Sequence, residues 1–237
     1  MSSQPVALRD WLWVILLGTI WGTSFLFNAV LIREIGPLWV SALRVGIGAL
    51  GCWAVFIALR KPLPRDLRLY GGFFVLGVIG YAIPFALFPL SQAHLASGVA
   101  AIINALTPIT TVIVSHFWPG GEKATVLKSA GIAAGFTGAA VLALPALQAG
   151  GTSQLWAIGA CLTATLCYAV TLNYTRRFAK IDPTTIATLA LTGAAVAAGA
   201  AAFLLEGVPV MTRIESVARS RRSRPPANVP SQTASSS

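Results

Sequence analysis

Stretches of about 20 apolar residues alternate along the chain with short polar connections. A helix needs about 20 apolar residues to cross the hydrocarbon core of a bilayer. Several connections contain proline or glycine, as in IGP at 35–37 and IDP at 181–183, which favours turns between antiparallel neighbours. The pattern therefore predicts an all-α membrane protein with about seven transmembrane helices in an up-and-down bundle. The predicted spans are 11–31, 36–59, 69–89, 95–118, 125–144, 154–174 and 184–206.

The composition supports a membrane protein and excludes a soluble one. Of the 237 residues, 56% are hydrophobic and 10% are charged, and the mean hydropathy is +0.75. An ordinary soluble domain has about 25% charged residues. The same composition excludes a disordered chain and a disulfide scaffold.

Lysine and arginine gather in alternate connections, although the net charge of +10 could suggest a nucleic-acid partner. With the N-terminus in the cytoplasm, ten cations fall on the inner side and only Arg33 on the outer side. An excess of Lys and Arg marks the cytoplasmic loops of membrane proteins. We therefore expect a multi-pass protein of the cell (inner) membrane, with a cytoplasmic N-terminus and no nucleic-acid partner. The ten cations are Arg9, Arg60, Lys61, Arg65, Arg68, Lys123, Lys128, Arg176, Arg177 and Lys180.

An ungapped shift of 146 residues aligns the first two spans with the sixth and seventh. The shift pairs seven identical residues and places Pro37 and Pro183 at equivalent positions beside the second helix of each copy. Because the odd number of five spans separates the copies, the second copy must be inverted, as in many secondary transporters. The expected organisation is a cytoplasmic N-terminus (1–10), a complete five-helix repeat (11–144), a partial second repeat (154–206) and a tail (207–237).

Arg44 is the sharpest candidate for a functional residue. It lies about eight residues into the second span, roughly 12 Å from its outer end at 1.5 Å per residue. A charge at that depth costs several kcal/mol unless it is paired or faces water, so it is a functional candidate by default. The alternative is a structural role, in which Arg44 ties carbonyl groups or a neighbouring helix.

Uncharged polar residues inside the other spans form three further candidate groups for a substrate pathway. Such side chains must find partners in lipid and are expected to face the bundle interior. Each group also has a structural alternative: hydrogen bonds between helices, or a plain kink where Pro108 removes a backbone donor and frees the carbonyl of Asn104. The groups are Trp21, Thr23, Ser24 and Asn28 in the first span, Asn104, Thr107 and Pro108 in the fourth, and Tyr168 and Thr171 in the sixth.

Several strings resemble the EamA-type drug/metabolite transporter superfamily: WGTSF at 21–25, GPLWVSALR at 36–44, NALTPITTVIVSHFWPGGE at 104–122, KSAGIAAGFTGAAVL at 128–142 and CYAVTLNYTRRFAKIDPTTIATL at 167–189. The resemblance covers about residues 10–206, and Gly22, Pro37, Glu122 and Pro183 match motif positions. It implies ten helices in two inverted five-helix repeats, cytoplasmic termini, and movement of small metabolites, amino acids or drugs, usually outward. This chain departs from that pattern by ending after about seven helices.

The leading interpretation is a secondary transporter, in the export direction, that works by alternating access on a small-molecule substrate. The alternatives are an integral-membrane enzyme and a non-transporting membrane protein that assembles with a partner half or as a homo-oligomer. No catalytic residue, metal site or cofactor is expected, because the sequence has no nucleotide loop, no HExxH and no nucleophile beside a base.

The tail at 207–237 has no leucine and no aromatic residue but has five arginines and a run of serine and proline. Such a segment cannot bury enough apolar surface to fold, so we expect disorder. Seven spans would also place these arginines outside, against the charge bias of the other loops. Three explanations are open: the seventh span does not insert, the tail is tolerated outside, or the reading frame was altered near 207–217. We favour the altered frame, which would leave the transporter inactive.

Overall fold

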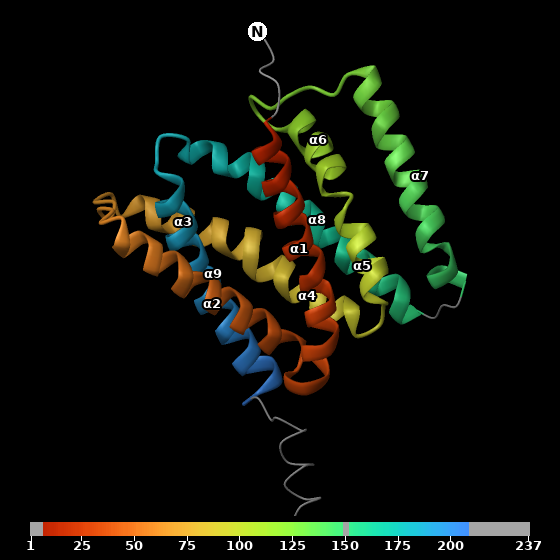
Figure 1. Cartoon of the computed structure of the whole chain (residues 1–237), viewed down its shortest axis with the longest axis horizontal. Helices are drawn as coiled ribbons and strands as arrows, with labels where there is room; N and C mark the ends of the chain where they lie inside the picture. Colours follow the sequence, from red (N-terminus) through yellow and green to blue (C-terminus); the bar gives the residue numbers. More distant parts are fainter. Residues whose placement is uncertain (1–6, 149–151, 209–237) are drawn as a thin grey trace, which may run out of the picture.

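The computed structural model describes residues 7–148 and 152–208, and every regular element within them is helical (Figure 1). Each predicted span corresponds to one long helix or to two or three helical segments in line. Six of these are long and apolar enough to cross a membrane, and the fifth contains a shorter apolar helix, Val126–Val141. The prediction of an all-α membrane protein with about seven helices is confirmed. The elements are α1 (Leu8–Ile35), α2 (Pro37–Ala58), α3 (Arg68–Gly77), the π-helical η1 (Val78–Ala82), α4 (Ile83–Gln92), α5 (Ser97–Asn104), α6 (Thr107–Phe117), α7 (Val126–Gln148), α8 (Thr152–Thr175), the 3₁₀ turn η2 (Arg176–Phe178) and α9 (Pro183–Glu206).

The outer surface of the bundle is apolar. On α1, for example, Leu12, Ile15 and Ile20 are each at least 60% exposed. With six helices long and apolar enough to cross a membrane, contiguous apolar surface of this kind is typical of a surface that contacts lipid. The chain is therefore a multi-pass membrane protein.

Helices α2 and α9 form an antiparallel pair that runs through the bundle (Figure 1). The Lys61 ammonium, just after α2, bonds to Asp182 at the start of α9 at 2.8 Å. At the other end Glu206 accepts hydrogen bonds from the backbone N–H groups of Leu38 (2.9 Å) and Trp39 (3.2 Å). Antiparallel α2 and α9 are what the predicted inverted repeat requires.

The N-termini of α2 and α9 are built alike. Pro37 and Pro183 open the two helices, where the missing N–H costs no hydrogen bond. A carboxylate caps each: Asp182 accepts from the N–H groups of Thr184 and Thr185 within α9, and Glu206 reaches across to α2. The hydrogen bond from Lys61 holds the pKa of Asp182 below its ordinary value.

Consecutive spans are not the main packing partners, which differs from the simple up-and-down bundle that the short connections suggested. Helix α8 packs on α4 and α6, whereas α9 packs on α2 and α3. Small residues explain the close fit in lipid, where helices associate through packing. Three such residues of α9, Ala194, Ala198 and Ala202, are buried in a cluster with Val45 of α2.

Helix α7 lies at the edge of the bundle (Figure 1). Three glycines recur along this helix at Gly131, Gly135 and Gly138. Only Gly135 meets a neighbour, Ile109 of α6, whereas Gly131 and Gly138 face open space among the described residues. Close helix contact at these glycines is therefore limited to Gly135 among the described residues.

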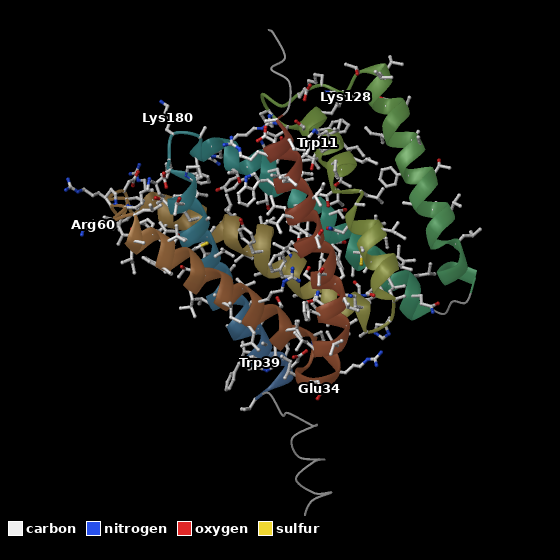
Figure 2. The ribbon with its side chains drawn as sticks, viewed as in Figure 1. Trp11, Glu34, Trp39, Arg60, Lys128 and Lys180 are labelled. Carbon is white, nitrogen blue, oxygen red and sulfur yellow. The ribbon has the colours of Figure 1, made fainter. Side chains whose placement is uncertain are left out.

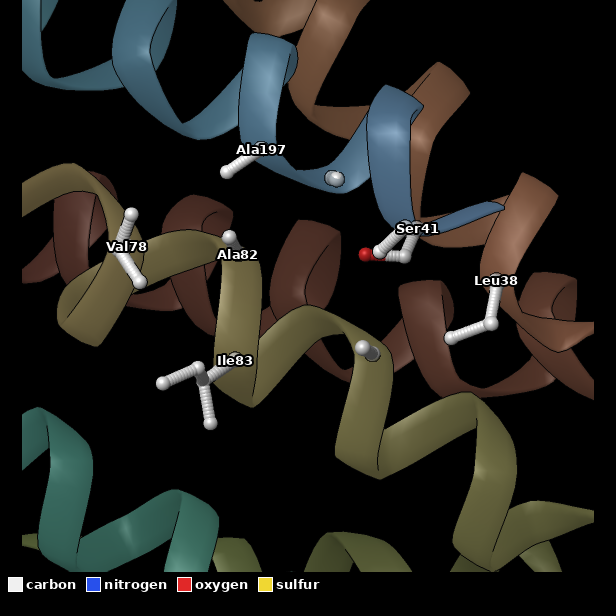
Figure 3. A pocket seen from close by; sticks show the side chains of 9 residues that line it. Leu38, Ser41, Val78, Ala82, Ile83 and Ala197 are labelled. Atoms are coloured by element: carbon white, nitrogen blue, oxygen red, sulfur yellow. The ribbon is translucent and has the colours of Figure 1, made fainter. Parts of the chain in front are cut away.

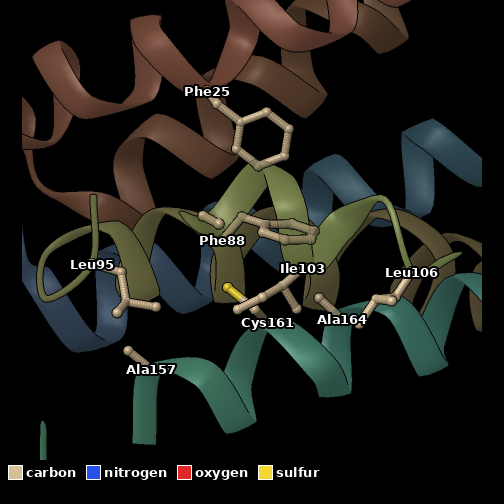
Figure 4. Close-up of a cluster of buried hydrophobic side chains, with 9 residues drawn as sticks. Phe25, Phe88, Leu95, Ile103, Leu106, Ala157, Cys161 and Ala164 are labelled. Carbon is tan, nitrogen blue, oxygen red and sulfur yellow. The ribbon is translucent and has the colours of Figure 1, made fainter. Parts of the chain in front are cut away.

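A second buried cluster joins α1, α4, α5 and α8 (Figure 4). Phe25 meets Phe88 edge to face at a ring distance of 5.4 Å. Cys161 and Ala164 of α8 are fully buried beneath these rings. The cluster fixes α8 against α1 and α4, and these helices also form the candidate site.

Charged and tryptophan side chains mark both ends of the bundle (Figure 2). Arg60, Lys128 and Lys180 lie at the same end as Trp11, whereas Glu34 and Trp39 lie at the opposite end. The prediction of a disordered tail concerns residues that lie outside the described part of the chain from 209 onward.

Candidate functional site

Arg44 of α2 points at α1 and α4. Its Nη1 donates to Asn28 Oδ1 (3.3 Å) and its Nη2 donates to Ser24 Oγ (3.2 Å). The guanidinium carbon also lies 4.5 Å from the centre of the Phe85 ring, in the geometry of a cation–π contact. Within residues 7–148 and 152–208 Arg44 forms no ion pair. Both roles raised from the sequence therefore fit its position, since it ties helices and carries an unneutralised charge.

Buried amides hold the partners of Arg44 in place. Asn28 Nδ2 donates to Gln92 Oε1 (3.1 Å), and Gln92 Nε2 donates to the Phe25 carbonyl (2.8 Å). Asn28 is 2% exposed and Gln92 is 7% exposed. Because each amide nitrogen has an acceptor, the Asn28 oxygen is left to face Arg44.

Six of the ten predicted pathway residues line one cavity of about 340 Å³, the aromatic cavity. Trp21 lies at the centre of α1, so this cavity is near the middle of the membrane. Trp21 meets Tyr168 edge to face at 6.3 Å. Contributions come from α1, η1, α4, α5, α6 and α8, and the lining residues are Trp21, Gly80, Tyr81, Phe85, Asn104, Thr107, Pro108, Tyr168, Thr171 and Leu172.

The fourth span is broken where it borders this cavity. Helix α5 ends at Asn104 and α6 begins at Thr107, with Pro108 in its first turn. Pro108 has no N–H for the carbonyl of Asn104, and the Thr107 hydroxyl donates to that carbonyl at 2.7 Å instead. The kink and the cavity wall are thus the same feature.

The π-helical turn η1 in the third span is a feature that the sequence analysis missed. Gly80 and Tyr81 of this turn line the aromatic cavity, and a π turn inside a helix is frequent at functional sites. Pro84 was a signal for it, because it removes the donor for the carbonyl of Gly80.

Three more predicted residues line a second cavity of about 310 Å³, the arginine cavity, between α1 and α2. Phe85 lies on the boundary of the two cavities, since it lines the aromatic cavity and its ring contacts Arg44. The lining residues are Ser24, Phe27, Asn28, Leu31, Ile35, Val40, Leu43, Arg44 and Ile47.

Thr23 is the one predicted pathway residue that lines neither cavity. Its side chain is exposed on α1, and its hydroxyl donates to the Thr19 carbonyl at 2.6 Å. A threonine in a membrane helix commonly satisfies its hydroxyl in this way.

A model of the EamA-like transporter family matches residues 10–144, more than half of the chain. The chain belongs to this family. An uncharacterized transporter of Archaeoglobus fulgidus is 26% identical to it over 186 residues, which is 78% of this chain and 64% of the relative. A Streptantibioticus cattleyicolor protein named as a probable terminal-alkyne amino-acid exporter is 28% identical over 62% of this chain and 49% of the relative.

Two further proteins are similar to this chain in sequence or in fold. Protein PagO of Salmonella typhimurium is 29% identical over 65% of this chain and 51% of its own length. A solved protein structure shares the fold at 23% identity, with a TM-score of 0.56 over 83% of this chain and 71% of that one. The chain thus spans about half to two thirds of the length of these curated relatives.

The other positions that matched the family motifs lie outside both cavities. Gly22 has no atom of another element within 4 Å of where a Cβ would lie. Glu122 precedes α7 and forms an ion pair with Lys128, whose hydrogen bond lowers the pKa of the Glu122 carboxyl. Gly22, Glu122, Pro37 and Pro183 therefore lie at positions where they support the helices and line neither cavity.

A third cavity of about 210 Å³ lies between α2, α4 and α9 (Figure 3). Its walls are mostly alanine, valine and leucine side chains. The Ser41 hydroxyl points into it and has no hydrogen-bond partner among the described residues.

The linings of the two main cavities offer groups that can bind a small molecule. Arg44 is the only charged residue in either lining, and the described residues contain no group of three potential metal ligands. Aromatic rings, hydroxyls and one guanidinium can hold a small molecule of mixed polarity.

Proposed function

We propose that this chain forms part of an exporter that moves small organic molecules across the cell inner membrane by alternating access. The observation that carries the proposal is the aromatic cavity, where a broken helix and a π turn meet near the middle of the bundle. Transporters place their substrate sites at such interrupted helices near the bilayer midplane. The names of the relatives point in the same direction and away from an enzyme.

The α2–α9 pair supports alternating access, because polar contacts tie it at both ends. Lys61 and Asp182 close one end, and Glu206 with the first N–H groups of α2 closes the other. On our proposal one tie opens while the other holds, so that the two ends of the α2–α9 pair separate in turn. The N-terminus lies in the cytoplasm, on the side of Arg60, Lys128 and Lys180.

A flux assay on the purified chain tests this function. The chain is reconstituted in liposomes loaded with a mixture of radiolabelled amino acids, a probe suggested by the name of one relative. The proposal departs here from the altered reading frame favoured from the sequence, which would leave the chain inactive, and we expect saturable efflux. Thr171→Val removes a hydroxyl from the aromatic cavity and should lower the flux about fivefold, the equivalent of one hydrogen bond of about 1 kcal/mol.

Thr163→Val is the matched control. Thr163 lies on the same helix but is exposed on the outside of the bundle, and its hydroxyl bonds to the Gly159 carbonyl in the way that Thr171 bonds to Cys167. Equal losses in the two variants, or flux no greater than in empty liposomes, would contradict the proposed pathway. The native mass of the purified chain, measured in the detergent used for purification, would show whether the active species is one chain or an assembly.

A further inference from the structure

The Arg44 guanidinium has unused hydrogen-bonding capacity. A guanidinium carries five N–H donors, and its two bonds here go to the neutral oxygens of Ser24 and Asn28. No carboxylate lies within ion-pair distance among the described residues. A cation inside a membrane without a negative partner is costly, so the site favours an anion.

The guanidinium lies too deep for a lipid headgroup to be its natural partner. Long cationic side chains in spans ordinarily turn toward the interface. Arg44 does not do so, since its partners Asn28 and Ser24 lie 7 and 11 residues, or about 10 and 16 Å, from the nearer end of α1. Its partner must therefore enter the interior of the bundle.

The direction of the guanidinium is fixed before any ligand arrives. The buried chain from Asn28 through Gln92 to the Phe25 carbonyl positions one acceptor. Ser24 donates its own proton to the Trp21 carbonyl at 2.6 Å, so its oxygen accepts from Arg44. Phe85 supports one face of the group. A preorganised planar fork of this kind matches a carboxylate.

The residues around Arg44 indicate the net charge of the ligand and the nature of its uncharged part. Arg44 supplies the only formal charge in the two cavity linings, so a single negative charge is balanced, whereas a phosphate monoester of about −1.5 to −2 would not be. On the other side of Phe85 the aromatic cavity offers the rings of Trp21, Tyr81 and Tyr168 to an apolar group.

We propose that Arg44 binds the carboxylate of a small monoanionic organic acid, and that the apolar part of the acid occupies the aromatic cavity. The inference rests on the proposed function in one respect, that the acid is the molecule transported. The binding site itself can be tested without transport.

A matched ligand series tests the binding site on the unaltered full chain in nanodiscs of neutral lipid. The probes are 3-phenylpropanoate, 3-phenylpropanamide and 2-phenylethyl phosphate, and the readouts are the thermal unfolding midpoint and Trp fluorescence. We expect the carboxylate to bind at least tenfold more tightly than the amide, and more tightly than the phosphate. Equal binding of acid and amide, or tighter binding of the phosphate, would overturn the assignment.

Two variants attribute the preference to Arg44. Arg44→Gln keeps hydrogen-bonding groups but removes the charge, and it should abolish the tenfold preference for the acid. Asn28→Asp keeps the arginine and supplies an internal carboxylate beside it, so it should also abolish acid binding without leaving a buried charge unpaired. A preference for the acid that persists in either variant would contradict the proposal.

Further measurements distinguish a lipid anion from a free organic acid. They also distinguish failure of the binding site from failure of the transport function. If phosphatidylglycerol in the nanodisc prevents binding of 3-phenylpropanoate through Arg44, the ligand is a lipid and the inference fails. Efflux of amino-acid amides as fast as amino acids would uphold transport and overturn the carboxylate site. Selective acid binding with no flux would uphold the site and contradict transport.

Discussion

The Thr107 hydroxyl replaces the backbone N–H that Pro108 lacks. This hydroxyl bonds to the carbonyl of Asn104, which Pro108 leaves without an N–H, at the mostly apolar wall of the aromatic cavity. A carbonyl without a donor in such a place costs about 1–3 kcal/mol. The short gap between α5 and α6 therefore depends on one side chain.

Thr107→Val should lower the stability of the protein by about 1–3 kcal/mol, because it keeps the shape of the side chain and removes the donor. Thr107→Ser keeps the donor and should retain most of the stability. The measurement is the free energy of unfolding in mixed detergent micelles. If the Val and Ser variants are equally stable, the hydroxyl does not support the break.

At the scale of helices, close backbone contact holds α9 in the bundle. A Cβ on Gly77 of α3 would overlap the carbonyl oxygen of Ala190 and would lie 3.1 Å from the Ala194 nitrogen. Gly71 in the same helix has nothing within 4 Å of the equivalent point. Substitutions at these two positions can therefore distinguish the effect of close packing at Gly77 from the general effect of glycine on helix stability.

Gly77→Ala should destabilise the protein by about 1–3 kcal/mol, because α3 and α9 must move apart to admit the methyl group. Gly71→Ala should be neutral or stabilising by up to about 1 kcal/mol, since alanine is the better helix former. Thermal unfolding of both variants in one detergent measures the difference. A Gly77→Ala variant as stable as Gly71→Ala would contradict the close contact.

The helices were more predictable from the sequence than their partners. Runs of about 20 apolar residues located all seven spans, and Pro108 located the break in the fourth, because both signals are local. The bond between Glu206 and Leu38 joins residues 168 positions apart, and the sequence carries no local sign of it. The site follows the same rule: Arg44 was identifiable as a buried charge, but its contact with Phe85 depends on how α2 meets α4.

At the scale of the whole molecule, the charges at the two ends of the bundle indicate its orientation in the membrane. The ion pair of Lys61 with Asp182 brings two cation-rich connections together at one end. Arg33 lines a cavity at the other end with Ala93, which follows α4. If cation-rich loops face the cytoplasm, the connection at 59–67 is inside and the connection at 93–96 is outside.

Single cysteines test this orientation in a version of the protein whose Cys52, Cys161 and Cys167 are replaced by alanine. Leu63→Cys and Ala93→Cys each place a thiol on an exposed connection at opposite ends of the bundle. A membrane-impermeant maleimide added to intact cells should label Ala93→Cys at once and Leu63→Cys only after permeabilisation, because ten cations against one strongly favour a single orientation. The reverse order would place the N-terminus outside. Labelling of both in intact cells would mean that the chain inserts in two orientations, and either result would contradict a cytoplasmic N-terminus.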